Sequence, residues 1–191
     1  ISADGRHILT ASWDERARLW DAKGTPVATL EGHTSSLNSA VFSADGRRIL
    51  TASWDQTARL WDADGKLVVT LAGHTNSVNS AVFSADGLRI LTASNDNTAR
   101  LWDAEGKLVA TLAGHTGEVY GAVFSADGLR ILSASGDNTV RLWDANGRSV
   151  ATLAGHTEKV FSARFSVDGR HILTASTDNT ARLWDTDGNR I

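Results

Sequence analysis

The sequence predicts an all-β fold made of repeated four-stranded antiparallel sheets, and three observations support this prediction. A unit of 41 residues recurs without insertion or deletion, apolar and polar residues alternate with the two-residue period of half-buried strands, and turn residues interrupt this alternation at regular intervals. The dipeptide Trp-Asp marks each copy of the unit. It lies at Trp20-Asp21, Trp61-Asp62, Trp102-Asp103, Trp143-Asp144 and Trp184-Asp185.

One unit shows the elements that we expect in every copy. Its four strands are expected at residues 78–83, 88–94, 98–102 and 108–112. The turns between them are expected at Asp86-Gly87, Asp96-Asn97 and Glu105-Gly106. Gly accepts the positive φ of a tight turn, so Asp-Gly is a strong hairpin signal. No stretch of the unit has the period of a helix.

A lone four-stranded sheet of this size cannot bury its faces, so each unit must stack on copies of itself. Radial stacking gives a β-propeller. The first copy begins after its inner strand and the last ends before most of its outer strand, so the sequence predicts an incomplete ring with three full blades and a partial blade at each end. Because the chain opens at Ile1 within a repeat, we expect it to be a fragment. The predicted units are a partial blade at 1–31, blades at 32–72, 73–113 and 114–154, and a partial blade at 155–191.

The shared motifs resemble those of the WD-repeat β-propeller family. Four copies contain Gly-His, then Ser-x-Asp-x-Thr, then Trp-Asp, and the resemblance covers essentially the whole chain with about four and a half repeats of 41 residues. Residues 42–82 and 83–123 are identical at 32 of 41 positions, as in bacterial arrays of near-identical repeats. The resemblance implies that each Gly-His to Trp-Asp repeat straddles two blades.

Each unit contains a Ser, a His and an Asp, the set of residues found in a serine hydrolase. The resemblance implies a structural tetrad instead, in which the indole N–H of Trp donates to Ser, Ser contacts His, and Asp holds His. A buried indole N–H needs such a partner, and a hydroxyl packed beneath it has no room for a substrate. We therefore predict no catalytic residue and no enzyme. The expected tetrads are His33, Ser53, Asp55 and Trp61; His74, Ser94, Asp96 and Trp102; His115, Ser135, Asp137 and Trp143; and His156, Ser176, Asp178 and Trp184.

Two segments have the opening pattern of a calcium loop, namely Asp62-Ala-Asp64-Gly65 and Asp185-Thr-Asp187-Gly188. The later acidic ligands and the closing Glu of such a loop are absent, so hairpin turns are the better interpretation. His7 and His171 stand where other copies have Arg, and we expect exposed second-strand residues there rather than ligands. The sequence predicts no metal and no cofactor.

If the shared positions build the scaffold, function is expected where the copies differ. The resemblance places two variable columns on the top face of the propeller, around the central channel, where partners commonly dock. These predicted protein-binding residues are Trp13, Trp54, Asn95, Asn38, Asn79, Tyr120 and Phe161. The alternative is that each aromatic packs against its own loop as a solitary surface residue. Arg164 replaces a Val found in other copies, and we expect it to line the channel.

Composition excludes some classes of function. The chain has 19 Lys+Arg against 22 Asp+Glu and a net charge of -3, so it lacks the basic surface expected for nucleic acid or an anionic membrane. It has 0 Cys, which favours a reducing compartment and a cytoplasmic location. We expect a non-catalytic protein-interaction scaffold or sensor module with a protein or peptide partner. The alternative is a self-assembling structural or engineered repeat protein that completes its ring as a homo-oligomer.

Overall fold

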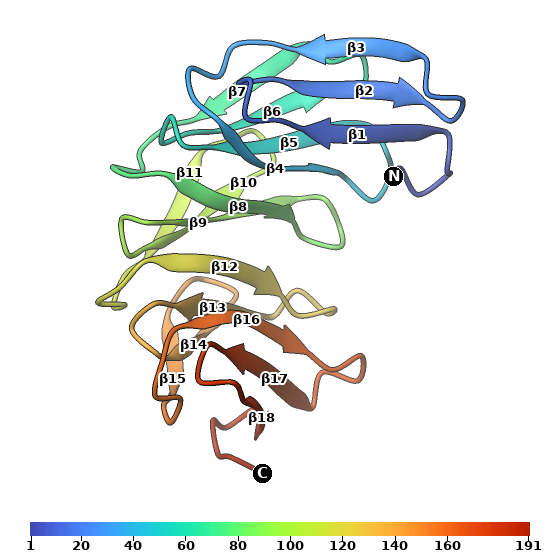
Figure 1. Ribbon diagram of the computed structural model, residues 1–191. Coiled ribbons are helices and arrows are strands. Elements are labelled where there is room, and N and C mark those ends of the chain that lie inside the picture. The colour runs from blue at the N-terminus through green and yellow to red at the C-terminus, as the bar shows by residue number, and fades with distance from the viewer.

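The computed structural model describes residues 1–191 and consists of β-strands joined by turns, without a helix (Figure 1). The strands form five antiparallel sheets, and in each sheet neighbouring strands are also consecutive in sequence. The sheets do not close into a ring. The predicted fold class, an incomplete β-propeller of four-stranded blades, is confirmed. No helix that could cross a membrane is present.

Three sheets have four strands each. The first of these contains β4 (Leu37–Phe42), β5 (Arg48–Ser53), β6 (Ala58–Asp62) and β7 (Leu67–Leu71). The second contains β8 (Val78–Phe83), β9 (Arg89–Ser94), β10 (Ala99–Asp103) and β11 (Leu108–Leu112). The third contains β12 (Val119–Phe124), β13 (Arg130–Ser135), β14 (Val140–Asp144) and β15 (Ser149–Leu153).

The two end sheets have three strands each. The N-terminal one contains β1 (His7–Ala11), β2 (Ala17–Asp21) and β3 (Pro26–Leu30). The C-terminal one contains β16 (Val160–Phe165), β17 (His171–Ser176) and β18 (Ala181–Asp185). The sheets follow one another in chain order from blue to red, so the two end sheets lie at opposite ends of the row (Figure 1). The inner strands β4, β8, β12 and β16 of successive sheets lie next to one another.

Both faces of a middle sheet are buried, because each face packs against a neighbouring sheet. In the β4–β7 sheet, Ile49 and Trp61 face the β1–β3 sheet and join a cluster with Leu19. Leu50 and Leu60 point the opposite way and join a cluster with the next sheet. The two-residue period of a strand produces this division. Full burial of one Trp contributes roughly 4–6 kcal/mol, taking about 25 cal/mol per Å² as an upper estimate.

One turn in every sheet, which precedes the strand with Trp-Asp, has a residue in the left-handed region. This residue is not glycine, and its φ lies between 63° and 72°. Asn tolerates this conformation better than most side chains, since its short amide bonds to the local backbone. The column consists of Glu15, Gln56, Asn97, Asn138 and Asn179.

Candidate functional site

In four of the five repeats, a chain of buried hydrogen bonds joins the Trp to a His and an Asp. In the β8–β11 sheet, Trp102 Nε1 donates to Thr92 Oγ1 at 3.0 Å, and Thr92 Oγ1 lies 2.7 Å from His74 Nε2. On the other side of the ring, His74 Nδ1 lies 2.7 Å from Asp96 Oδ2. Asp96 also accepts hydrogen bonds from Thr98 Oγ1 at 2.6 Å and from the Thr98 backbone N–H. The network thus ties β9, β10 and the turn between them to the loop before β8.

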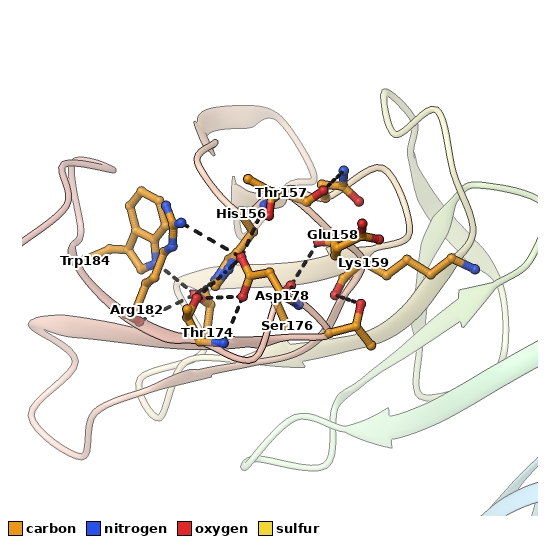
Figure 2. Close-up of polar contacts among 12 residues, drawn as sticks. His156, Thr157, Glu158, Lys159, Thr174, Ser176, Asp178, Arg182 and Trp184 are labelled. Atoms are coloured by element: carbon orange, nitrogen blue, oxygen red, sulfur yellow. Dashed lines mark hydrogen bonds and ion pairs between the residues drawn. The ribbon is translucent and has the colours of Figure 1, made fainter.

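The same network recurs in every sheet that has a Gly-His segment, and Figure 2 shows it around His156. The hydroxyl that lies between indole and imidazole is Thr51, Thr92, Ser133 or Thr174. The His–Asp pairs are His33–Asp55, His74–Asp96, His115–Asp137 and His156–Asp178. The Trp donors are Trp61, Trp102, Trp143 and Trp184.

The predicted serines are not members of these tetrads, and this part of the sequence analysis was wrong. Each of them holds the loop before the inner strand through a hydrogen bond to a backbone carbonyl, as Ser176 does to Glu158 at 3.0 Å (Figure 2). Each also accepts the backbone N–H of the Asp two residues later. The four residues with this role are Ser53, Ser94, Ser135 and Ser176.

Strand register explains which hydroxyl the indole reaches. Trp61 pairs with Ile49, so the nearest hydroxyl on the same face is Thr51, the diagonal neighbour across the two strands. Ser53 is on that face too, but one residue pair further along the strand, about 6–7 Å beyond Thr51. A signal for the correct residue was present in the sequence, because every copy has a hydroxyl at the column of Thr51.

Donor and acceptor capacities fix the protons in the network. The Asp55 carboxylate only accepts hydrogen bonds, so His33 Nδ1 carries a proton and donates to it, while Nε2 accepts from the Thr51 hydroxyl. Burial lowers the pKa of His33 against the opposing effect of Asp55, and the same holds for His74 and His115. These imidazoles are therefore neutral near pH 7.

The tetrad carboxylates are held in the charged form. Burial by itself raises the pKa of Asp55, but hydrogen bonds from Thr57 and His33 outweigh it and leave the pKa below its usual value. The pKa values of Asp96 and Asp137 are lowered in the same way. A hydrogen bond from Thr180 is the largest cause of the lowered pKa of Asp178. The group combines a neutral imidazole with a carboxylate, but the hydroxyl is covered by the indole and the side chain of His33 is 0% exposed. The arrangement supports packing rather than nucleophilic attack.

The two variable columns lie side by side on the structure. Trp54 Nε1 donates to Asn38 Oδ1 at 2.7 Å, and Asn79 Nδ2 donates to Asn95 Oδ1 at 2.6 Å. The rings of Tyr120 and Phe161 lie with centroids 4.7 Å apart, across two neighbouring sheets. Large aromatic surfaces remain open, since the exposed fractions are 80% for Trp13, 51% for Trp54 and 50% for Phe161. Tyr120 is half-buried.

A scan against protein-family models matches the chain five times to the model described as WD40, WD domain, G-beta repeat. The matches cover residues 1–21, 24–62, 65–103, 106–144 and 147–185. The chain belongs to the WD40 repeat family. A search of curated proteins finds no match. WD40 repeat proteins are typically non-catalytic scaffolds for protein–protein interaction, which agrees with the closed tetrads.

The two segments of this WD40 chain that begin like calcium loops are held by hydrogen bonds within each turn. Asp62 Oδ1 accepts the backbone N–H groups of Asp64 and Lys66, and Asp185 Oδ1 bonds in the same way to Asp187 and Asn189. Both segments are hairpin turns, and no cluster of three or more metal-ligating side chains is present.

His7 and His171 occupy the strand position from which other copies make a hydrogen bond to the next sheet. In the middle sheets it holds arginines that reach a carbonyl in the next sheet, as Arg48 Nη1 does to Ala104 O at 2.6 Å. Arg89 and Arg130 make equivalent contacts. His7 and His171 are half-buried and donate no such bond.

Proposed function

We propose that the chain is a non-catalytic protein-interaction platform that binds a protein or peptide partner on the face formed by the two variable columns. We call this surface the aromatic face. It consists of Trp13, Trp54, Asn95, Asn38, Asn79, Tyr120 and Phe161. A cytoplasmic location stays a prediction from composition.

The exposure of large aromatics at variable positions carries this proposal. The scaffold does not require them, because other copies have Asn95, Gly136 or Thr177 at the column of Trp13 and Trp54. Exposed indoles cost solubility, yet Trp13 is 80% exposed. Aromatic side chains are the commonest anchors of protein interfaces. A single exposed aromatic needs no explanation, but four in two adjacent columns form a surface on which a partner can anchor.

Variants that carry residues found at the same position in other copies test the proposed platform function. Trp13→Asn with Trp54→Asn, and Tyr120→Asn with Phe161→Asn, place residues on the aromatic face that other copies already carry, so the fold is preserved. Partners crosslinked to the native chain should be lost from at least one double variant. Leu129→Arg is the matched control, since Leu129 is 64% exposed in a different turn and other copies have Arg there. Retention of every partner by both double variants would show that the aromatic face is not the binding surface.

Self-assembly is the second candidate, and the end sheets favour it. Leu173 is 52% exposed and Leu183 is 41% exposed, whereas the equivalent Leu50 and Leu60 are 0% exposed because another sheet covers them. At the other end of the row, Trp20 lacks a covering sheet and is half-buried. Each end face thus presents one half of a contact that the molecule makes internally.

Light scattering separates the two candidates. A mass that is a discrete multiple of 20.4 kDa, and that returns to 20.4 kDa in Leu173→Lys with Leu183→Lys, supports assembly through the end faces. A mass of 20.4 kDa for the native chain at all concentrations rules it out.

A further inference from the structure

Two inner strands, β12 and β16, depart from the sequence of the repeat. β4 and β8 share the sequence Asn-Ser-Ala-Val-Phe after their first residue. In β12 and β16 four positions differ, namely Tyr120, Gly121, Phe161 and Arg164. All four line a single cavity of about 190 Å³, which we call the β12–β16 cavity. The remaining positions of these strands keep the repeat residue.

One of these differences removes a hydrogen bond that joins neighbouring inner strands in the other copies. Asn38 Nδ2 donates to the Val78 carbonyl at 2.9 Å, and Asn79 Nδ2 donates to the Val119 carbonyl at 2.9 Å. Each bond ties one inner strand to the next. Tyr120 stands in the same column, and its hydroxyl donates instead to Glu118 at 3.4 Å. The contact between the rings of Tyr120 and Phe161 thus stands where the other copies have a hydrogen bond between inner strands.

The β12–β16 cavity has an apolar wall and a single charge. The rings of Tyr120 and Phe161 form one side, and a Cβ added to Gly121 would meet no atom within 4 Å, so the space beside it is open. Arg164 is the one charged residue among those that line the cavity, and it is exposed. The ion pairs made by arginines in this chain involve Arg6, Arg16, Arg18 and Arg182 but not Arg164.

Two further charged residues contact Tyr120 but do not line the cavity. Lys159 Nζ lies 5.9 Å from the centroid of the Tyr120 ring, and Glu118 contacts the hydroxyl of the same residue. Arg164 is therefore the charge that an occupant of the cavity meets. Guanidinium groups bind carboxylates in bidentate geometry, and such charge-assisted bonds are stronger than neutral ones. A volume of about 190 Å³ leaves room for one peptide side chain.

We propose that the β12–β16 cavity binds a partner peptide through an Asp or Glu side chain that lies beside an apolar residue. Arg164 pairs with the carboxylate, and Tyr120 with Phe161 contacts the apolar neighbour. This inference rests on the proposed platform function and names the chemistry of one of its contacts.

A displayed library of random heptapeptides with blocked carboxyl ends tests the proposal on the 191-residue chain. Peptides selected on the native protein should be enriched in Asp or Glu next to an apolar residue, and selection on Arg164→Val should lose the acidic preference. Val is the residue of the other copies at this column, so the variant preserves the fold. An enriched peptide should bind roughly tenfold more tightly than its Gln counterpart, as expected for a charge-assisted bond, and Arg164→Val should abolish this difference.

Two further variants separate this inference from the platform function. Tyr120→Asn with Phe161→Asn should weaken the acidic peptide and its Gln counterpart alike, whereas Leu129→Arg, which adds a charge elsewhere, should change neither. Selection without acidic enrichment, or enrichment that persists in Arg164→Val, overturns the carboxylate site. If partners still depend on Trp13 and Trp54 in that case, the platform stands without it; if they depend on no residue of the aromatic face, both proposals fail.

Discussion

The middle sheets and the end sheets share a sequence pattern but differ in burial. Trp102 is 2% exposed and its network includes His74, whereas Trp20 in the N-terminal sheet is half-buried and its indole donates to Thr10 with no His beyond it. At the C-terminal end, Leu183 is 41% exposed while the equivalent Leu101 is 0% exposed. A repeat residue therefore contributes to stability mainly through the neighbouring sheet, as in other repeat proteins.

The largest difference in stability between the middle and end sheets is expected when their Trp residues are replaced. Trp102→Ala removes a side chain packed against the preceding sheet and should lower the free energy of unfolding by about 3–5 kcal/mol. Trp20→Ala should cost less than half as much, because no sheet covers that face. Equilibrium urea unfolding of the two variants measures the difference. Equal losses would contradict the dependence on neighbours.

Removal of the tetrad hydroxyl should have the next largest effect on the free energy of unfolding. Thr92→Val leaves the Trp102 N–H and His74 Nε2 without a partner in a buried site, at a cost of about 2–3 kcal/mol. Thr10→Val should cost under about 0.5 kcal/mol, since water reaches the Trp20 indole. Ser94→Ala removes a loop bond and should cost about 1 kcal/mol. A larger loss for Ser94→Ala than for Thr92→Val would restore Ser94 as the indole acceptor.

Acid should destabilise the chain through the buried imidazoles of the middle sheets. The folded pKa values of His33, His74 and His115 lie below 6.5, so below about pH 6.5 the unfolded chain binds protons that the folded chain does not. Stability is thus complete above that pH and falls as the pH drops, by up to about 1.4 kcal/mol per pH unit for each His. The lowered pKa values of Asp55, Asp96 and Asp137 add a further loss below about pH 3.8. Urea unfolding between pH 8 and pH 4 measures this slope, and a flat profile would contradict neutral imidazoles.

An arginine in place of His7 should strengthen the junction with the next sheet. Arg48 bonds to the Ala104 carbonyl, and by repeat equivalence Arg at position 7 reaches the carbonyl of Ala63. His7→Arg should stabilise the chain by about 1 kcal/mol. His171→Arg is the matched control and should have no effect, because no sheet follows its own in the structure. Thermal unfolding of both variants tests this, and an equal gain would show that the added charge acts without the bond.

The smallest expected gains in stability come from the left-handed turn residues, and these gains should be the same in an end sheet and in a middle sheet. Glu15 and Gln56 hold φ values of 72° and 71° in equivalent turns, where other copies have Asn. Glu15→Asn and Gln56→Asn should each stabilise the chain by about 0.5 kcal/mol, since Asn accepts this conformation more readily. Thermal melts measure both. A gain in the middle sheet alone would show that turn strain also depends on the neighbouring sheets.

Signals from residues close in sequence were sufficient to predict the strands, but not to identify the hydroxyl of the tetrad. The period of 41 residues, the alternation and the Asp-Gly turns predict every strand to within a residue or two, because they act between residues close in sequence. The choice between Thr51 and Ser53 depends on which hydroxyl lies diagonally from Trp61 across two strands. Motif matching favoured the Ser of Ser-x-Asp, and the register showed otherwise.

By itself, the sequence determined the all-β repeat, the sheet meander and the family, because strand period and turn chemistry are properties of short segments. Only the tertiary structure decided which hydroxyl receives each indole, which leucines stay exposed on the end sheets, and that Tyr120, Gly121, Phe161 and Arg164 meet in one cavity. These features depend on side chains from different strands or sheets coming within a few ångströms, and such distances are set by packing rather than by spacing along the chain.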